Sequence, residues 1–504
     1  MNFRILSKFL GALLLLESVA MAACGVFAVL DPVADESAAI TSLFMSSGIV
    51  AVAGTLLVLC GIGKIERIPR REGIVVVGLG WLLCGVVGAL PYLLGEPKLG
   101  IADALFESVS GFTTTGATIM GSDAAAGNDI ESWPRGILLW RAVTQWLGGM
   151  GILVLFVAIL SYLGMGSKSL FRNESSFQTG EASIARIRDT ATTLWKLYLC
   201  ISLACMLGLK AMGLSTYNAI CHTFTVVSTA GFSPHNESIG YYMKWGNGWL
   251  IELWLSFFMV LCSISFLVWV VLIRKRWKRL KDEEEGRFFV ICVLGAAFII
   301  TMSIARPGDE HFLDTLRHCW FTVVSIASTT GYATVDYNTW PAFGVVVLIM
   351  LMMLGGCSGS TAGGMKVSRL IVFIKTARFE IVKAFRPNQV FHMHVNGNPL
   401  GESERMQTVV FVALYAVITM VSVFVVALLE AGNTGHPTDL VTAFGCVLAT
   451  LTNTGPGFGD VGPYDNYGHL LPMTKLFLSL LMILGRLELY AILVLFTPTL
   501  WKRY

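Results

Sequence analysis

The chain has 504 residues, of which 55% are hydrophobic and 14% charged, and its formal net charge is +3. Soluble globular proteins contain about 25% charged residues, so this composition argues against a soluble protein and favours one that lies in a membrane. A net charge this small gives no indication of nucleic-acid binding, and we expect none.

The first apolar stretch, residues 9–23 ("FLGALLLLESVAMAA"), has two interpretations. Small residues before Cys24 are typical of a signal-peptide cleavage site. However, the apolar character continues to Phe27, and many more apolar stretches follow. We therefore predict a retained first helix, which forms a two-helix unit over residues 1–70 with the second apolar stretch.

A membrane-spanning helix needs about 20 mostly apolar residues. On this basis the sequence predicts an all-α polytopic membrane protein with ten spans, at 8–30, 38–63, 73–95, 136–164, 190–213, 247–274, 287–305, 341–374, 407–430 and 472–499. Basic clusters such as "KIERIPRRE" (64–72) and "RKRWKRLK" (274–281) all fall on one side if there are ten crossings. The excess of basic residues in cytoplasmic loops then predicts that both termini are cytoplasmic.

Four shorter apolar segments remain between the spans, at 100–113, 215–228, 310–327 and 437–450. Each is too short to cross a membrane. Each ends in a motif of small polar residues and glycine, and each is followed by another span. We therefore predict four like-oriented repeats around an axis, over 71–188, 189–284, 285–404 and 405–504, the third with a broken second span.

The four motifs are "TTTGA" (113–117), "STAGF" (228–232), "STTGY" (328–332) and "TNTGP" (452–456). Non-helical backbone is tolerated at membrane depth only where protein buries it or where it lines a watery path. Carbonyl oxygens along such a path could replace the water around a cation, and a short helix would direct its negative C-terminal end at the ion. A single motif of this kind is more simply a helix cap or turn, but four in equivalent places favour an ion filter. The candidate filter residues are Thr114, Thr115, Gly116, Thr229, Ala230, Gly231, Thr329, Thr330, Gly331, Asn453, Thr454 and Gly455.

These motifs resemble those of the Trk/Ktr/HKT superfamily of potassium transporters, and within it the bacterial TrkH/TrkG branch. The resemblance covers nearly the whole chain and is carried by the two extra N-terminal helices and by "SGFTTTGAT", "STAGFSPHN", "STTGYAT", "NTGPGFGDVGP", "GGCSGSTAGGMK" and "GRLE". It implies four M1-P-M2 repeats, as in potassium channels, around one pore. The transported ion would be potassium, held at the candidate filter residues and taken up across a prokaryotic inner membrane.

The same resemblance has implications for selectivity and partners. In the plant HKT relatives, serine in place of the first filter glycine accompanies sodium preference, so the four glycines here imply potassium. The resemblance also implies a homodimer and a peripheral TrkA-type subunit that binds NAD(H), ATP or ADP. No organic cofactor is expected on this chain itself. A sodium-selective or sodium- or proton-coupled transporter of the same fold is the main alternative.

The stretch "LGGCSGSTAGGMK" (354–366) interrupts the predicted eighth span. So many glycines make a poor helix. They indicate either close packing through small residues or a broken helix that lines a cavity. A phosphate-binding loop is a weaker alternative, because Met365 and Lys366 break its pattern. The resemblance implies a gate below the filter, formed by Gly355, Gly356, Gly359, Ser360, Thr361, Gly363, Gly364 and Arg486.

Arg486 lies within the predicted last span, where an arginine is costly unless it is paired or hydrated. It either pairs with a distant carboxylate or, as the resemblance implies, stands in the pore. Glu107 is expected to pair with backbone or a neighbouring repeat, and His222 to be a satisfied polar contact. Asp460 and Asp465 lie at the predicted outer mouth, where they either concentrate cations or belong to a solvated loop.

Two other classes of function fit the sequence less well. An intramembrane enzyme, such as a lipid transferase, needs converging acid, base or metal ligands. The sequence has no H-E-x-x-H motif, paired carboxylates or nucleophile–base spacing, so we do not expect an enzyme. A receptor or assembly protein would leave the four motifs unexplained.

Overall fold

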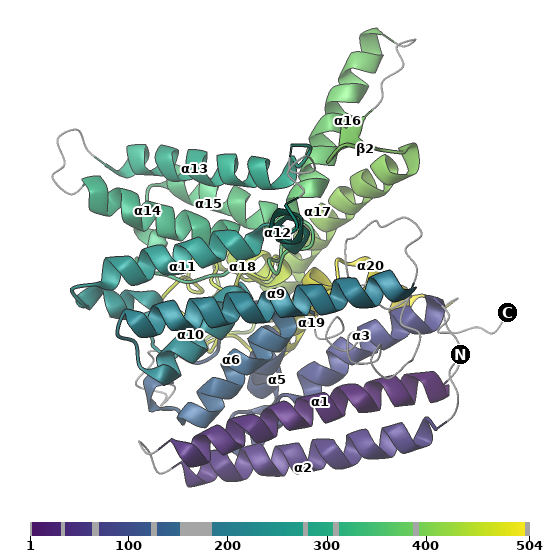
Figure 1. The fold of residues 1–504 in the computed structure, drawn as a ribbon. Helices are drawn as coiled ribbons and strands as arrows, with labels where there is room; N and C mark the ends of the chain where they lie inside the picture. The colour runs from purple at the N-terminus through teal and green to yellow at the C-terminus, as the bar shows by residue number, and fades with distance from the viewer. Residues whose placement is uncertain are drawn as a thin grey trace.

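The computed structural model describes residues 3–31, 36–62, 70–121, 129–151, 184–275, 281–305, 312–386 and 393–498. Most of the long helices run alongside one another, with α1 and α2 at one edge and α13, α14 and α15 at the opposite edge (Figure 1). In the described part of the chain, six helices are long and apolar enough to cross a membrane, or seven if one bent pair is a single span. The chain is therefore a multi-pass helical membrane protein, whereas the ten crossings stay a prediction.

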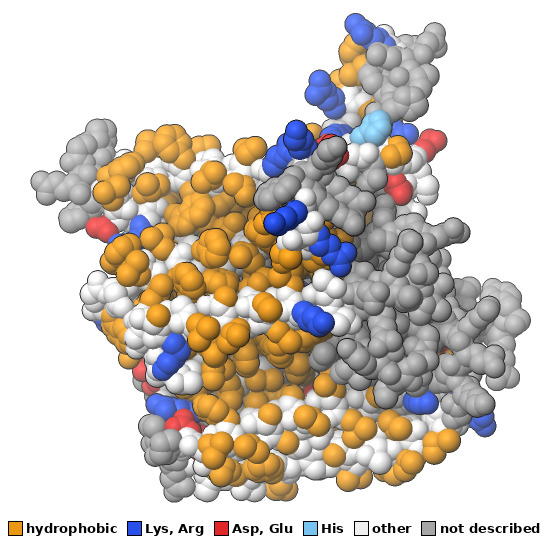
Figure 2. Space-filling model, viewed as in Figure 1, with side chains coloured by type: hydrophobic (Ala, Val, Ile, Leu, Met, Phe, Trp, Pro, Cys, Tyr) orange, Lys and Arg blue, Asp and Glu red, His pale blue; other side chains and the backbone are white. Residues whose placement is uncertain are grey.

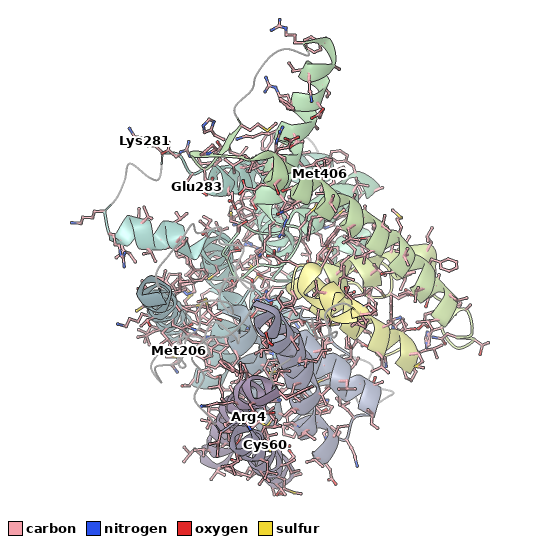
Figure 3. The ribbon with its side chains drawn as sticks, turned by 90° about the vertical axis from the view of Figure 1, so that its right-hand side faces the viewer. Arg4, Cys60, Met206, Lys281, Glu283 and Met406 are labelled. Atoms are coloured by element: carbon pink, nitrogen blue, oxygen red, sulfur yellow. The ribbon has the colours of Figure 1, made fainter. Side chains whose placement is uncertain are left out.

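The N-terminal pair, α1 (Phe3–Leu30) and α2 (Ser37–Cys60), packs closely along its length. A Cβ placed on Gly11 would lie 2.6 Å from the carbonyl oxygen of Gly54, so this approach requires a glycine. Figure 3 labels Arg4 at the start of α1 next to Cys60 at the end of α2. The pair also contacts α3 and α6, which fixes it against the remaining helices.

The other helices form four groups, each with a long first helix, a short second helix that ends at a glycine motif, and a third helix. The first group is α3 (Arg70–Val87), α4 (Leu90–Leu94), α5 (Ile101–Phe112), η2 (Ile130–Ser132) and α6 (Arg135–Gly149). The second is α9 (Ile184–Ala211), α10 (Thr216–Val227), η3 (Ser238–Lys244), α11 (Gly248–Ser263) and α12 (Phe266–Ile273).

The third group is α13 (Glu285–Ile304), α14 (Phe312–Ala327), η5 (Tyr337–Thr339), α15 (Ala342–Leu354) and α16 (Val367–Phe385). An antiparallel hairpin follows it, β1 (His394–Val395) with β2 (Asn398–Pro399). The fourth group is α17 (Glu402–Glu430), α18 (Leu440–Leu451), α19 (Pro472–Arg486), α20 (Tyr490–Leu493) and η6 (Val494–Phe496).

The four short helices connect the groups into a closed arrangement. Each packs against the third helix of the preceding group: α10 on α6, α14 on α11, α18 on α15, and α5 on α19. Because the last contact joins the fourth group to the first, the groups surround a common axis. The glycine motifs at the ends of the short helices are thereby brought together.

Four predicted spans are not continuous helices. In the span 73–95, two residues separate the end of α3 from the start of α4. The span 247–274 bends by 93° between α11 and α12. The span 341–374 contains no helix between Leu354 and Val367. In the span 472–499, α19 ends at Arg486, and Glu488 and Leu489 have positive φ. The predicted span 136–164 is helical to Gly149, and its part beyond residue 151 lies outside the described residues.

The outer surface matches a membrane environment. Hydrophobic side chains cover much of the face drawn in Figure 2, and its charged side chains lie mostly toward the two ends. Large apolar side chains on the long helices are exposed, among them Leu203, Phe257, Ile291 and Met420. Lipid chains would cover such residues, because the exposure of apolar surface to water is unfavourable.

Candidate functional site

The four short helices end in the same backbone conformation. Two residues before the glycine of each motif, a non-glycine residue adopts φ between 53° and 56°: Thr114, Thr229, Thr329 and Asn453. The following amide then donates to the carbonyl five residues earlier at 2.9 Å in all four motifs, for example from Thr330 to Ser325. A β-branched residue rarely adopts a positive φ, so three strained threonines in equivalent places indicate a functional constraint.

The four motif glycines, hereafter the ring glycines, form a closed ring. A Cβ placed on each would lie 1.9 to 2.6 Å from a carbonyl oxygen of the next group; the pairs are Gly116 with Ala230, Gly231 with Thr330, Gly331 with Thr454, and Gly455 with Thr115. All four also have positive φ, from 80° to 96°. Only glycine fits both the space and the conformation, so these positions place main-chain oxygens of all four motifs around one point.

A cavity opens onto this ring. It has a volume of about 70 Å³, and all four ring glycines line it together with Thr118, Tyr464 and Asp465. A water molecule needs roughly 10–15 Å³ on the same measure, so several waters fit. The ring is therefore reached from an aqueous space on the side where the glycine motifs lead into loops.

Asp465 supplies negative charge to this cavity. Burial, followed by the charges of Asp336 and Asp460, raises the pKa of Asp465 above the ordinary aspartate value. The sequence predicted Asp460 and Asp465 at an outer mouth, and the structure places Asp465 in the cavity wall. The charges of Asp336 and Asp460 therefore disfavour the charged form of Asp465.

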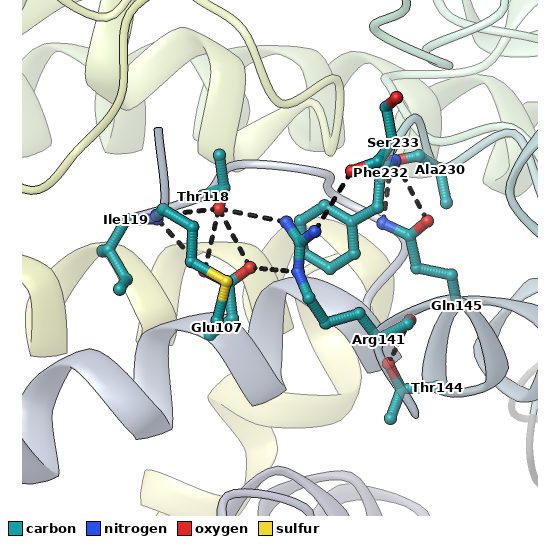
Figure 4. Close-up of polar contacts among 10 residues, drawn as sticks. Glu107, Thr118, Ile119, Arg141, Thr144, Gln145, Ala230, Phe232 and Ser233 are labelled. Carbon is teal, nitrogen blue, oxygen red and sulfur yellow. Dashed lines mark hydrogen bonds and ion pairs between the residues drawn. The ribbon is translucent and has the colours of Figure 1, made fainter. Parts of the chain in front are cut away.

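A buried ion pair supports the ring from behind (Figure 4). Arg141 on α6 donates to Glu107 on α5 at 2.7 Å, and the two side chains are 2% and 0% exposed. Glu107 also accepts from the hydroxyl of Thr118, while Arg141 donates to the carbonyl of Ser233 in the second group at 3.3 Å. The pair therefore joins the backbone that follows two ring glycines.

Gln145, one helical turn beyond Arg141, makes a second support in the same view. Its amide nitrogen donates to the carbonyl of Ala230 at 3.0 Å, and its amide oxygen accepts from the amide of Phe232. The Ala230 oxygen retains a second lone pair. Gln145 thus fixes the backbone on both sides of Gly231.

Further contacts connect the remaining groups behind the ring. Tyr337 donates to the carbonyl of Gly457 at 2.9 Å, and the amide of Tyr467 donates to the carbonyl of Thr118 at 2.9 Å. His222 contacts Tyr332 between the second and third groups. Together with Arg141 these contacts run from each group to the next, and they form a belt of polar bonds around the ring.

The glycine-rich stretch 355–366, hereafter the inner loop, lies directly against the other side of the ring. Its Gly363 amide donates to the hydroxyl of Thr329 at 2.7 Å, and its Gly364 amide donates to the carbonyl of Thr452 at 2.8 Å. The hydroxyl of Thr229 lies 3.3 Å from that of Thr361. Three of the four motifs are therefore in contact with the inner loop.

The inner loop fills the break in the neighbouring bent helix. Amides of Cys357 and Thr361 donate to carbonyls of Ser263 and Cys262, which the bend between α11 and α12 leaves free. Within the loop, Gly355 and Gly356 pack against Gly363, Gly364 and Ala362. Gly359 accepts from the amide of Phe266, and Ser360 bonds to Cys357. Two interrupted helices thus satisfy each other's backbone groups, as the membrane interior requires.

Arg486 ties the inner loop to two other groups. Its guanidinium donates to the carbonyl of Thr361 at 2.8 Å, and to those of Gly148 and Gly149 at 2.9 and 3.0 Å. The last two carbonyls lie at the C-terminal end of α6, and that of Gly148 also accepts from the amide of Gly151 at 2.9 Å. Glu488 is instead paired with Arg369. The guanidinium of Arg486 thus binds backbone oxygens of the inner loop and of α6, and its positive charge lies on the inner-loop side of the ring.

Several residues of this site were not predicted from the sequence. Arg141 and Gln145 carried a usable signal, because two polar residues one turn apart are unusual in an apolar span. Glu107 was predicted to pair with backbone or with a neighbouring repeat; it accepts from the amide of Ile119, and its ion-pair partner Arg141 belongs to its own group. His222 is a satisfied polar contact, as predicted, although its tyrosine partners are distant in sequence.

Comparison with known proteins places this geometry in a family. Residues 44–503 match the family model TrkH, described as a cation transport protein. The Trk system potassium uptake proteins TrkH of Halomonas elongata and of Escherichia coli K12 are each 35% identical to the chain, over the whole of both proteins. TrkG of Escherichia coli K12 is 34% identical over 86% of each chain.

A solved structure agrees with these relatives. The crystal structure of the potassium transporter TrkH from Vibrio parahaemolyticus superposes with a TM-score of 0.84, at 30% identity and over the full length of both chains. The chain belongs to the TrkH family of cation transport proteins.

Proposed function

We propose that this protein takes up potassium ions across the cell membrane through the ring of main-chain oxygens at the four glycine motifs. The observation that carries the proposal is the closed sequence of contacts in which each ring glycine adjoins a carbonyl of the next group. Uncharged oxygens from four sides can replace the hydration shell of a monovalent cation. The ligands would be the backbone and hydroxyl oxygens of the twelve predicted filter residues.

Each helix group would then be one M1-P-M2 repeat, and ten crossings would place both termini in the cytoplasm. The cavity at the ring would face outward and the inner loop inward. An entering ion gains about 2.3 kcal/mol per 100 mV of membrane potential. Transport driven by the membrane potential needs no covalent step on the chain. We propose that the protein lies in the inner membrane of a prokaryotic cell.

The inner loop and Arg486 would form the gate. Support comes from their direct bonds to the ring motifs and to one another. A loop held against the ring blocks the exit of an ion, and a guanidinium charge below the ring raises the barrier for a cation. Opening would require the loop to leave Thr329, Thr452 and Arg486.

A cytoplasmic regulator of TrkA type would act on this gate. The side chain of Asn396, in the hairpin turn, donates to Glu285 at 2.8 Å, and Glu285 accepts from the amide of Ser358 in the inner loop at 2.9 Å. Force on the hairpin would thus reach the loop through two hydrogen bonds. Lys281 and Glu283 lie at the same end of the molecule as Met406, as Figure 3 shows.

We also propose a homodimer. Support comes from α16, which extends away from the other helices (Figure 1) and exposes Ile374, Ile381 and Phe385 along one side. These residues are spaced by seven and four positions, so they share a helix face. A second copy of the chain would cover this apolar face.

The proposal is tested by potassium-limited growth of a strain that lacks its own uptake systems. Cells that carry this chain should grow at low potassium, and sodium added in excess should not slow potassium entry. Growth no better than that of the empty strain would contradict the proposal. Potassium entry that requires sodium, or that excess sodium inhibits, would favour the sodium alternative. The names of the relatives give no support to that alternative.

A further inference from the structure

The residue that follows each ring glycine differs among the four motifs. Ala117, Phe232 and Pro456 have no side-chain hydrogen-bonding group, whereas Tyr332 has a hydroxyl. Tyr332 is 1% exposed and directly follows Gly331, which lines the cavity at the ring. A contact made by this hydroxyl therefore acts one residue from the ring itself.

Tyr332 extends away from the ring into the second helix group. Its hydroxyl lies 3.2 Å from Nδ1 of His222 on α10 and also contacts the hydroxyl of Thr225. Its backbone is held within its own group, because the hydroxyl of Ser325 donates to the Tyr332 carbonyl at 2.7 Å. The side chain is thus a strut between the ring backbone of the third group and the short helix of the second.

His222 fixes the outer end of this strut. It is fully buried, and its other ring nitrogen, Nε2, lies 3.1 Å from the hydroxyl of Tyr242 in η3. A neutral imidazole has one donor and one acceptor nitrogen, and a tyrosine hydroxyl can serve either. Both nitrogens are therefore satisfied, and a buried network with all its bonds made is rigid.

The backbone at Gly331 has little freedom on its inner side. A Cβ there would meet the carbonyl of Thr454 at 2.1 Å, while the neighbouring Gly231 adjoins the carbonyl of Thr330. A small displacement of the strut would therefore change the distances between oxygens of three motifs. A site discriminates between cations of different radius through the distances between its oxygens or through the field strength of those oxygens. Both depend on where the oxygens lie.

We propose that His222 is a positioning residue which, through Tyr332, sets the discrimination of the ring between potassium and smaller cations. The inference deepens the proposed function and rests on it. His222 would not touch the ion. Its effect would appear in the ratio of transport rates rather than in the amount of folded protein.

The test uses the full chain in vesicles, with uptake of potassium, rubidium and sodium measured at matched protein amounts. Tyr332→Phe removes only the hydroxyl, and His222→Leu removes both ring nitrogens. Each should lower the potassium-to-sodium rate ratio by about fivefold, a factor that corresponds to the loss of one hydrogen bond. His222→Asn keeps a polar atom near the position of Nδ1 and should restore most of the ratio.

Tyr415→Phe is the matched control, since Tyr415 is buried on α17 and its hydroxyl has no partner among the described residues. It should leave the ratio unchanged. Equal slowing of all three cations in Tyr332→Phe and His222→Leu would overturn the inference and leave the proposed function standing. A wild-type chain that carries no potassium would overturn the proposed function, and the inference with it.

Discussion

Arg486 donates a hydrogen bond of 2.8 Å to the carbonyl of Thr361, so the end of the last long helix is tied to the inner loop. Arg486→Ala should raise ion flux by at least about tenfold, because it removes both a tether and a positive charge; a hydrogen bond from a charged donor contributes about 1.5–3 kcal/mol. The measurement is uptake at equal amounts of protein in the membrane.

Arg486→Lys separates the two effects. Lysine keeps the charge but lacks the planar fork that reaches several carbonyls at once. If the tether dominates, the lysine variant should resemble the alanine variant, and if the charge dominates it should resemble the wild type. Unchanged or reduced flux in Arg486→Ala would contradict the role of this residue in the gate.

The hydroxyl of Thr361 lies within 3.3 Å of Thr229 and of the carbonyls of Val227 and Cys262. Thr361→Val keeps the side-chain shape and removes these contacts, so it should weaken closure of the inner loop. We expect flux to rise about fivefold, on the basis of about 1 kcal/mol for one net hydrogen bond. Thr419→Val is the control, because the buried hydroxyl of Thr419 donates to the Tyr415 carbonyl of its own helix, α17. Equal effects of the two changes would exclude a specific role for Thr361.

The Arg141–Glu107 pair is predicted to be essential for stability. Arg141→Met leaves the Glu107 carboxylate buried without its cation, and breaking a buried pair costs about 3–5 kcal/mol. The thermal midpoint of the purified protein in detergent should fall clearly. The double variant Glu107→Leu with Arg141→Met should lose less than Arg141→Met alone, and a larger loss would argue against a pairwise contribution.

The raised pKa of Asp465 predicts that potassium uptake depends on the pH at the outer mouth. Because burial and neighbouring carboxylates raise its pKa, Asp465 takes up a proton at a higher pH than an ordinary aspartate. As outside pH falls through that window, the mouth loses negative charge and attracts fewer cations. The apparent KM for potassium should rise with little change in maximal rate.

Asp465→Asn should raise the apparent KM at neutral pH and remove this part of the pH dependence. Added inert salt should reduce the difference between the variant and the wild type, since it screens charges over about 10 Å at 0.1 M. A pH profile that keeps its shape in Asp465→Asn would assign the effect to another group.

The features that the sequence predicted well are local. The short helix α10 was expected at 215–228 and spans Thr216–Val227, because its motif carries its own capping residues and glycine. The interruption at 355–366 was likewise expected from glycine content. Such signals lie within about ten residues and need no knowledge of distant partners.

The features that were missed depend on contacts between distant segments. The bend between α11 and α12 has no glycine or proline to mark it; the inner loop, about 95 residues later, satisfies the freed carbonyls. The end of α19 at Arg486 likewise coincides with bonds to Gly148 and Thr361. An apolar pattern gives the length of a span but not where another segment interrupts it.

The central claim is that main-chain oxygens at the ring glycines bind the transported ion. The most direct measurement is the potassium and sodium uptake of wild type, Gly231→Ser and Gly331→Ser in an uptake-deficient strain at matched expression. A Cβ at these positions would lie 1.9 and 2.1 Å from carbonyl oxygens of Thr330 and Thr454, so the oxygens must move. We predict that the wild type prefers potassium and that both serine variants lose this preference. Serine variants that transport potassium with unchanged rate and preference would contradict the account.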